Sequence, residues 1–408
     1  MADARFRVAV VGAGPAGATA ANALSLSGVG DIALIDRARF PRDKTCGDGI
    51  TGTAAALMRE IALDHLLAQH PKVEKVVMTA PSGAQAIADI REEQTLSETY
   101  VIPRTVFDAY LANAALERGA ADFTGYKLER AEWRDGRWTL HLSDGEGAGG
   151  TRSIGADFLI SADGATSRVR RTLGIPFNPE KRTLIAIRAY ATFASRQVPQ
   201  MRFEMVDGIF RSGYAWMFGY GPHEANIGVG LFLTHYKAQS RHLRDVLDLY
   251  AGYLGDGIVV DRASMQSAPL PGAAPLPRLA VPQLHAALIG DAASMINCTT
   301  GEGISYGMAA GLLLGRLLAD AMANGSSLAA AAQRYEQEFR RQYSGHLRDN
   351  FHLSLLLSTS VWSQFALERM VKNYRRSDRA YKDALRFISG VQPTVPFTSM
   401  LWHGLVRS

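Results

Sequence analysis

Length and composition place this chain among globular proteins of more than one domain. Its 408 residues are 47% hydrophobic and 20% charged, which is enough to form two domains with cores of their own. Cys46 and Cys298 are too few for a disulfide scaffold and favour a reducing compartment. The net charge of +5 comes from basic residues interleaved with acids, without a nucleic-acid-binding motif. We find no apolar run of about 18 residues that would predict a membrane-spanning helix.

The first expected element is a strand that leads into a glycine-rich turn and a helix, over residues 8–24. Gly12, Gly14 and Gly17 have the Gly-x-Gly-x-x-Gly spacing of a dinucleotide-binding turn. In that motif the first glycine makes the tight turn, the second admits a pyrophosphate, and the third lets helix and strand pack closely. Asp36 ends the next expected strand, where a carboxylate accepts hydrogen bonds from ribose hydroxyls. We therefore predict a nucleotide-binding first unit, with the pyrophosphate at the helix N-terminus.

The middle of the chain alternates between helical and strand-like segments. Residues 101–120 have helical spacing and carry Arg104 at the helix start, where the helix dipole disfavours a cation. A phosphate partner would explain this arginine, and a solvated side chain is the alternative. Residues 131–155 alternate around two Asp-Gly turns, which is typical of a β-meander. Residues 184–260 are rich in expected strands and indicate an antiparallel domain, and the proline-rich segment 269–283 is a connector.

A second glycine-rich segment follows at residues 286–307. Its apolar start predicts a short buried strand that ends at Gly290-Asp291, and a helix is expected to begin near Gly303. Glycines before a helix start again indicate close approach of the backbone to a ligand. A second dinucleotide turn is missing from the sequence, so we expect no separate NAD(P) domain. Glycines 307, 311 and 315 recur on one helix face, which predicts close helix packing.

One dinucleotide turn followed by a late Gly-Asp strand resembles the FAD-binding flavoproteins of the p-hydroxybenzoate hydroxylase type. Asp163 and Gly164 match the Asp-Gly motif of that group. Four segments narrow the resemblance to the geranylgeranyl reductase family: FPRDKTCGDGIT (40–51), SGYAWMFGY (212–220), ANIGVGLF (225–232) and NCTTGEGISYG (297–307). That family includes prenyl-quinone reductases and saturates isoprenoid carbon–carbon double bonds. The resemblance extends to about residue 320 and preserves the order of the motifs.

The resemblance implies FAD as the cofactor and assigns site residues by matching position. Besides the turn glycines Gly12, Gly14 and Gly17, the implied FAD contacts are Ala16, Asp36, Cys46, Gly47, Gly49, Arg104, Asp291, Gly303 and Ile304. Tyr214 and Trp216 belong to a Tyr-x-Trp-x-Phe strand that would face the substrate. The helix opening near Gly303 would stabilise negative charge at the N1–C2 carbonyl edge of the reduced flavin.

We predict an α/β Rossmann-like FAD-binding domain interleaved with an antiparallel β-sheet substrate domain, followed by a mainly helical C-terminal region. The expected pieces of the FAD-binding domain are 1–75, 101–180 and 276–325. The expected pieces of the substrate domain are 76–100 and 181–275, and the C-terminal region is 326–408.

Several of the implied roles have structural alternatives. Cys46 is the predicted catalytic residue, pressing on the isoalloxazine ring or assisting protonation, and a buried small hydrophobe is the alternative. Asp48 caps a turn or binds the cofactor. For Tyr214 and Trp216 the alternative is ordinary core packing. Two positions depart from the family pattern, because Gly219 and Cys298 stand where the reductases usually have proline. We expect the first to reshape the substrate cavity and the second to reshape the loop beside the flavin.

The predicted reaction is reduction of carbon–carbon double bonds in an isoprenoid or similar apolar substrate, by hydride transfer from reduced FAD. Electrons would come from an external donor: NAD(P)H, ferredoxin or a flavin reductase. The alternative is a flavin-dependent monooxygenase, epoxidase or halogenase that acts with oxygen on an aromatic or apolar substrate. Halogenases usually carry Gly-Glu-Ser where this chain has the Cys46–Gly49 segment, although Lys44 lies where they keep a basic residue. A flavin-binding carrier or assembly subunit is the non-enzymatic alternative.

The ends of the chain indicate its location and partners. A strand expected within a few residues of Met1 leaves no room for a signal peptide, so we expect a cytoplasmic protein. The basic segment 370–387 is interpreted as a solvated helix face. The alternative is contact with a carrier or with anionic lipid, which would place the protein peripherally at the inner face of a membrane. We expect no nucleic-acid partner and no metal site.

Overall fold

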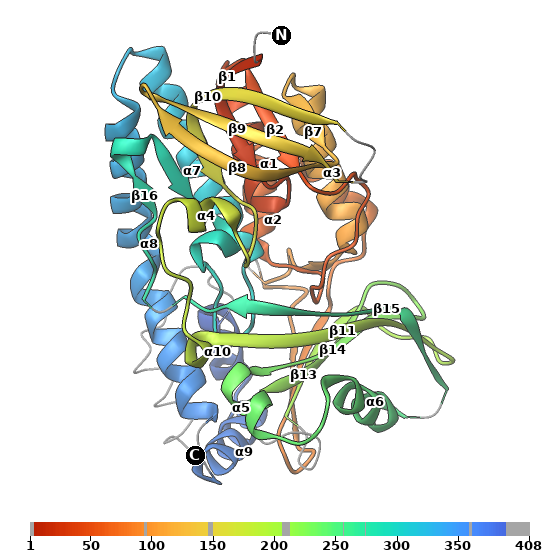
Figure 1. Cartoon of the computed structure of the whole chain (residues 1–408). Coiled ribbons are helices and arrows are strands. Elements are labelled where there is room, and N and C mark those ends of the chain that lie inside the picture. Colours follow the sequence, from red (N-terminus) through yellow and green to blue (C-terminus); the bar gives the residue numbers. More distant parts are fainter. Residues whose placement is uncertain are drawn as a thin grey trace.

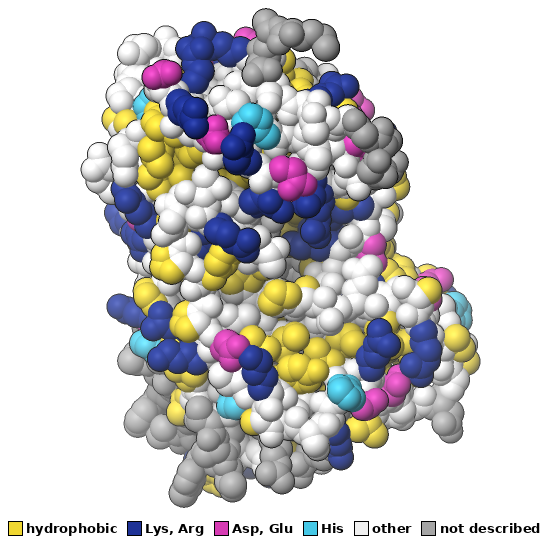
Figure 2. Space-filling model, in the orientation of Figure 1, with side chains coloured by type: hydrophobic (Ala, Val, Ile, Leu, Met, Phe, Trp, Pro, Cys, Tyr) yellow, Lys and Arg dark blue, Asp and Glu magenta, His cyan; other side chains and the backbone are white. Residues whose placement is uncertain are grey.

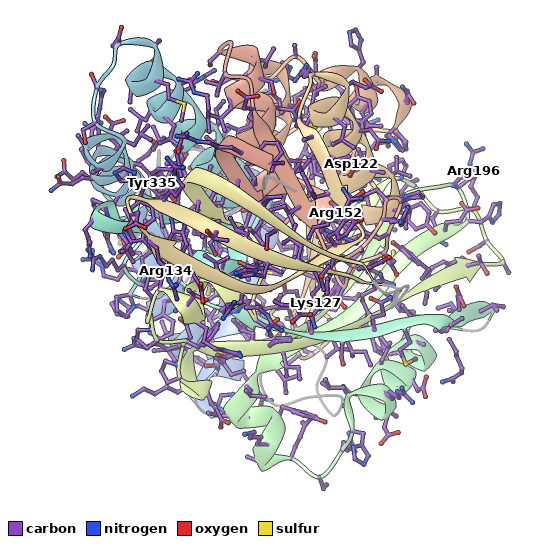
Figure 3. The ribbon with its side chains drawn as sticks, turned by 45° about the horizontal axis from the view of Figure 1, so that its top comes forward. Asp122, Lys127, Arg134, Arg152, Arg196 and Tyr335 are labelled. Atoms are coloured by element: carbon purple, nitrogen blue, oxygen red, sulfur yellow. The ribbon has the colours of Figure 1, made fainter. Side chains whose placement is uncertain are left out.

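The computed structural model describes residues 4–93, 96–145, 150–205, 213–255, 257–273, 275–358 and 361–388. Two β-sheets lie one above the other, and the long helix α8 (Leu328–Ser358) runs beside both (Figure 1). Tyr335 on α8 donates its hydroxyl proton to the carbonyl oxygen of Leu288 in the first sheet, at 2.8 Å (Figure 3). The helix therefore joins the two halves of the molecule.

The first sheet carries the dinucleotide turn. Its central strands are parallel, in the order β17-β10-β1-β2-β7, and β16 adds an antiparallel edge. They are β1 (Ala4–Val11), β2 (Ile32–Asp36), β7 (Ala121–Thr124), β10 (Thr151–Ser161), β16 (Ala280–Val281) and β17 (Ala286–Leu288). β1 and β2 are buried where they pair, as expected for parallel strands that are covered on both faces.

Helices cover one face of this sheet and a β-meander covers the other (Figure 1). The helices are α1 (Pro15–Leu26), α3 (Arg104–Glu117) and α7 (Ile304–Ala323), and α2 (Gly52–Glu60) packs on α7. Gly311 of α7 lies so close to α1 that an added Cβ would be 2.4 Å from the carbonyl oxygen of Ala16, so the predicted close helix packing is confirmed. The meander is formed by β8 (Tyr126–Arg134), β9 (Arg137–Asp144) and the start of β10. As predicted, its first turn is Asp135-Gly136, and both residues have positive φ.

The second sheet has seven strands in the order β15-β11-β14-β13-β12-β4-β5. They are β4 (Lys75–Thr79), β5 (Gln85–Asp89), β11 (Thr183–Phe193), β12 (Gln200–Glu204), β13 (Tyr214–Gly219), β14 (Glu224–Phe232) and β15 (Ile258–Pro271). The expectation of a wholly antiparallel sheet is wrong at one place, because β12 pairs with β4 in parallel. The strands reach this sheet from two separate stretches of the chain, so a pair that joins the two stretches is not set by a hairpin turn.

The two faces of the second sheet have different partners. Alternate side chains such as Ala189, Met217 and Val229 pack against Val246 and Leu247 of α6 (Leu243–Leu254). The other face turns towards the first sheet and the C-terminal helices. Short elements complete the fold: β3 (Gly49–Ile50), β6 (Tyr100–Val101), α4 (Arg168–Thr172), α5 (Leu233–Ala238), and the single turns η1 (Asp64–Gln69), η2 (Glu180–Arg182), η3 (Pro282–Leu284) and η4 (Gly290–Ala293).

The C-terminal region is helical through the residues that the structure describes. After α8 come α9 (Val361–Arg376) and α10 (Asp378–Ile388), which both pack on β5. Within the basic segment 370–387, Lys372 pairs with Glu368, Lys382 with Asp378, and Arg386 with Glu93. Such pairs are typical of a solvated helix face. The last twenty residues of the predicted region, 389–408, lie outside the described residues.

Surface charge and helix character agree with the composition. Lys and Arg side chains are interspersed with Asp and Glu over the face shown in Figure 2, and apolar side chains gather there over the second sheet. None of the described helices combines the length and the apolar character that a membrane span requires.

Candidate active site

A cavity of about 230 Å³ is lined by strands of the second sheet and by the loops and helix starts that follow the strands of the first sheet, and it brings distant parts of the chain together. Most of the residues that the sequence assigns to the site line it. These are Gly14, Ala16, Cys46, Gly47, Gly49, Arg104, Tyr214, Trp216, Asp291, Gly303 and Ile304. Gly12, Gly17 and Asp36 lie outside the lining, in the turn, in α1 and at the end of β2 respectively. Gly219 and Cys298 do not line the cavity either, and the expected effect of Gly219 on its shape stays a prediction.

The dinucleotide turn has the shape that a pyrophosphate site requires. Gly12 has φ +105°, and an added Cβ would be 2.1 Å from the carbonyl oxygen of Ala162. At Gly17 an added Cβ would be 1.8 Å from the carbonyl oxygen of Gly12, so this glycine allows the helix to pack on the turn. No side chain caps the start of α1, and its first amides are available to an anion. Gly14 lines the cavity there, where the nearest atom to an added Cβ is Nη2 of Arg42 at 3.4 Å.

Asp36 stands at the end of β2 with a carboxylate already fixed by the backbone. Its Oδ2 accepts from the Ala13 amide at 2.9 Å, and its Oδ1 accepts from the Ala38 amide at 3.0 Å. A carboxylate has about four acceptor positions, so lone pairs are left for ribose hydroxyls. The turn, the uncapped helix start and this carboxylate together fit a dinucleotide cofactor.

Asp291 follows Gly290, which lies against Ala16 at the start of α1, and is held by Lys44. The ammonium group of Lys44 donates to Oδ2 of Asp291 at 3.0 Å. Burial acts to raise the pKa of Asp291, but Lys44 and Arg104 outweigh it and leave this pKa below its ordinary value. Asp291 is therefore ionised at neutral pH. α7 begins close by at Ile304, which lines the cavity, so the N-terminus of this helix faces the cavity. In its first turn the Ser305 amide donates to the Glu302 side chain.

Arg104 has a partner that the sequence analysis did not name. Its Nε and Nη2 donate to the two carboxylate oxygens of Asp108, both at 2.6 Å, one turn further along α3. Arg42 donates to the same carboxylate at 2.8 Å. The cation at the helix start is thus compensated within the chain, while Arg104 still lines the cavity. The i, i+4 spacing of Arg104 and Asp108 on a predicted helix is the signal in the sequence that could have indicated this ion pair.

The loop that carries Cys46 is fixed by Asn226, another residue that the sequence analysis missed. The side-chain amide of Asn226 donates to the carbonyl oxygen of Cys46 at 2.7 Å and to Oδ2 of Asp48 at 2.8 Å. Burial raises the pKa of the Cys46 thiol above its ordinary value, although Arg104 opposes this, so the thiol is neutral. Asp48 is fully buried with φ +65° and lies outside the cavity lining. The signal in the sequence that could have identified Asn226 is its side-chain amide, which stands among the mainly apolar residues of β14.

Aromatic side chains of β13 form the wall opposite the dinucleotide turn. Tyr214, Trp216 and Phe218 alternate onto the cavity face, whereas Ala215 and Met217 pack on the α6 side. The ring centroids of Tyr214 and Trp216 are 6.1 Å apart, and those of Trp216 and Phe218 are 6.3 Å apart. Both predicted substrate-facing rings therefore line the cavity.

Two further features complete this wall. Trp216 lies over Gly228 of β14, where an added Cβ would be 2.1 Å from its ring. Beyond the aromatic rings the lining is apolar and includes Val76, Ile90, Leu96 and Leu385. Isolated apolar residues such as these belong to no sequence motif, so the sequence analysis did not assign them to the site.

Other predicted motif residues have structural roles. Asp163 accepts from the amides of Arg168 and Val169 and so caps α4, whereas Gly164 lines the cavity. Cys298 is buried against Leu184 and Phe232.

Residues 5–214 match the FAD binding domain family. The chain is 33% identical to the menaquinone reductase of Mycobacterium tuberculosis H37Rv over 317 residues, 76% of each chain. It is 28% identical to digeranylgeranylglycerophospholipid reductase 1 of Methanopyrus kandleri, over 85% of this chain and 88% of that one.

Solved structures share the fold. A geranylgeranyl bacteriochlorophyll reductase-like protein from Thermoplasma acidophilum superposes with a TM-score of 0.81 at 19% identity, covering 98% of this chain and 96% of that one. A flavin-dependent brominase has a TM-score of 0.74 at 16% identity, covering 95% and 94%. The match to the FAD binding domain and the reductase relatives agree with the cofactor site described above. The chain therefore belongs to the geranylgeranyl reductase family of FAD-binding flavoproteins and is an FAD-dependent oxidoreductase.

Proposed function

We propose that this oxidoreductase saturates carbon–carbon double bonds of an isoprenoid or similar apolar substrate. The observation that carries the proposal is that one cavity joins the dinucleotide turn to an aromatic and apolar wall. Bound FAD, once reduced, supplies a hydride from N5. A prenyl chain needs apolar walls that bury most of its surface, and the lining from Trp216 to Leu385 is of that kind.

The residues divide into those that hold the cofactor and those that face the substrate. Gly12, Gly14, Ala16, Gly17 and Asp36 would hold the adenosine and pyrophosphate, by the geometry of the turn. The flavin side would be held by Cys46, Gly47, Gly49, Arg104, Asp291, Gly303 and Ile304. Tyr214 and Trp216 would contact the substrate, and the Cys46 thiol would shape the approach of its double bond to the flavin.

The names of the relatives support a lipid substrate. One is a reductase of menaquinone and the other a reductase of a digeranylgeranyl phospholipid. A hydrophobic lipid of this class is the substrate we propose here. The interleaved pieces 1–75, 101–180 and 276–325 would form the FAD-binding domain, and 76–100 with 181–275 the substrate domain. NAD(P)H, a ferredoxin or a flavin reductase would supply the electrons.

A reaction with oxygen is the competing function, because flavin-dependent halogenases share the fold. Lys44, the basic residue that would serve a halogenase, is held in the ion pair with Asp291. Because Lys44 is already paired with the Asp291 carboxylate, a role in supporting the cofactor site is favoured over a role in halogenation.

The test compares products formed with and without oxygen. Enzyme reduced with dithionite would be mixed with a geranylgeranyl lipid or an aromatic substrate, and the products identified by mass spectrometry. A gain of two hydrogens without oxygen is the expected result. A gain of one oxygen or one halogen, only in air, would overturn the proposal.

A further inference from the structure

Glu302 is a carboxyl group on the cavity wall that the proposed function has not used. It lies between Gly301 and Gly303, just before α7, and lines the cavity. Its Oε1 accepts from the Ser305 amide at 3.2 Å and from the Ser305 hydroxyl, with the Thr51 hydroxyl at 3.5 Å. Its Oε2 is buried and has no hydrogen-bond partner among the described residues. One oxygen is thus fixed, and the other is left for a proton.

Two carboxyl groups on this cavity have pKa values shifted in opposite directions. Asp291 is paired with Lys44, which keeps it ionised. Glu302 forms no ion pair within the described part of the chain, and burial raises its pKa to about 7, against the hydrogen bonds from Ser305. In enzymes, two carboxyl groups whose pKa values are pushed apart by their surroundings commonly have different roles. The one with the raised pKa serves as the acid, and the other stays ionised.

The other proton-bearing groups on the wall are weaker acids. The Tyr214 hydroxyl donates to the carbonyl oxygen of Thr300, and burial raises its pKa far above the ordinary value. Burial also raises the pKa of the Cys46 thiol. Glu302 is close to the substrate wall, because an added Cβ on the preceding Gly301 would be 3.3 Å from the Tyr214 hydroxyl oxygen.

We propose that Glu302 is the proton donor for alkene reduction, an inference that rests on the proposed function. As one alkene carbon accepts hydride from reduced FAD, the π electrons form a bond from the other carbon to the proton on Oε2. The reduced flavin is oxidised, the alkene is reduced, and Glu302 is left as a carboxylate. The Ser305 amide and hydroxyl and the N-terminus of α7 stabilise that charge until water returns the proton.

The groups around Glu302 set the expected pH dependence. Ser305 on α7 and Thr51 at the start of α2 donate hydrogen bonds and do not titrate. The titratable neighbours are Tyr306 on α7 and Tyr343 on α8, whose pKa values are raised by burial and by Glu302, so both stay neutral. The rate of alkene reduction should therefore fall as the pH rises through about 7, where Glu302 loses its proton.

The test measures anaerobic oxidation of the reduced flavin by the alkene in single turnovers across this pH range. Glu302→Gln should lower the rate constant by about 10²-fold or more and remove the fall near neutral pH. Glu302→Asp, which keeps the acid, should retain the fall. Ser305→Ala removes a donor that lowers the pKa of Glu302, so its falling limb should move to higher pH. Infrared spectra of the FAD-free protein should show a protonated carboxyl band that Glu302→Gln lacks.

Four outcomes would overturn the inference. Wild-type rates in Glu302→Gln would exclude a donor role, and so would a loss of FAD affinity that accounts for the slower reaction. A slow Glu302→Gln enzyme whose rate still falls near neutral pH would assign the titration to another group. If the wild type oxidises its reduced flavin only in oxygen, the proposed function fails together with the donor role. If the wild type reduces the alkene without oxygen, the proposed function holds. Any of the first three results then overturns the donor role of Glu302 alone.

Discussion

The indole N–H of Trp216 donates to Oδ1 of Asn226 at 2.9 Å, while the amide group of the same Asn226 holds the Cys46 loop. One side chain thus positions both the aromatic wall and the loop that faces it. The hydrogen bonds of Asn226 to Trp216 and Asp48 are buried, and the one to the Cys46 carbonyl is partly buried. Removing the Asn226 amide would leave these partners unsatisfied, at a cost of about 1–3 kcal/mol for each buried group. The distance between the substrate wall and the Cys46 loop is therefore set by Asn226.

Gly228→Ala tests the position of the tryptophan. Its Cβ would be 2.1 Å from a ring carbon of Trp216, so the indole must move into the cavity. We expect a loss of about 1–3 kcal/mol in the binding of a prenyl lipid, with FAD content unchanged, and a similar loss in Trp216→Ala. Gly155→Ala, in β10 and outside the cavity lining, is the control, because the nearest atom to its added Cβ would be 3.9 Å away. Lipid affinity is measured for each variant by titration with the lipid, with flavin fluorescence as the signal. Equal lipid affinities for Gly228→Ala and the control variant would refute the position of the Trp216 ring.

Gly14→Val tests the cofactor turn. The first added carbon has room in the protein, 3.4 Å from Arg42, but it occupies the approach of the pyrophosphate. The variant should fold and purify without yellow colour, and added FAD should not restore the flavin absorbance. Gly17→Ala makes the comparison, because its Cβ would be 1.8 Å from the Gly12 carbonyl and should disrupt the turn itself. Circular dichroism separates the two effects. A yellow Gly14→Val protein would mean that the cofactor enters by another route.

Cys46→Ser tests the role of the thiol. We expect alkene reduction to slow by about tenfold, equal to 1.4 kcal/mol of barrier, while FAD stays bound and reducible by dithionite. Cys298→Ser is the control, because that thiol is buried outside the cavity and should affect folding stability without changing the rate. Stopped-flow absorbance of the flavin gives the rate constants. An unchanged rate in Cys46→Ser would leave this residue as a packing group.

Asp48→Asn tests a buried carboxyl through the pH dependence of stability. Burial raises the pKa of Asp48 from 3.8 to about 7, although Asn226 and Arg188 oppose it. Between these values the folded state keeps a proton that the unfolded state has lost. The contribution of Asp48 to the free energy of unfolding therefore falls by about 1.4 kcal/mol per pH unit as the pH rises through this window. Asp48→Asn should remove that fall.

Urea unfolding at about pH 5 and pH 7 measures the effect, because stability follows the protons bound by each state. Asparagine tolerates the positive φ of this position and keeps an oxygen for Asn226. A slope that is the same in the wild type and Asp48→Asn would mean that the carboxyl is ionised in the folded protein.

The parts of the structure that the sequence predicts well are those fixed by local spacing. The Gly12–Gly17 turn, the Asp135-Gly136 hairpin and the close packing of α7 on α1 all follow from residues near one another in the chain. Cys46, Tyr214 and Trp216 meet at one cavity as the family resemblance implied. Their roles in the reaction stay predictions.

The parts that the sequence did not predict depend on long-range pairing. The parallel pairing of β4 with β12 joins residues more than a hundred positions apart, and no turn sets its register. Leu385 reaches the cavity only because α10 folds back onto β5. Glu302 had a signal, a carboxyl group between two glycines before a helix, but its protonation depends on burial that a linear sequence does not show.

The parallel pairing of β4 with β12 has a consequence for exchanging substrate preference between relatives. Residues 183–271 form a continuous block that carries most of the second sheet, so they invite transplantation into another flavoprotein of this fold. The transplanted block would meet the β4 of its new host, and the edge of β12 would have to match a strand it did not evolve beside. A working chimera must therefore carry residues 75–89 as well, which makes the smallest portable unit two pieces of chain inserted at two places.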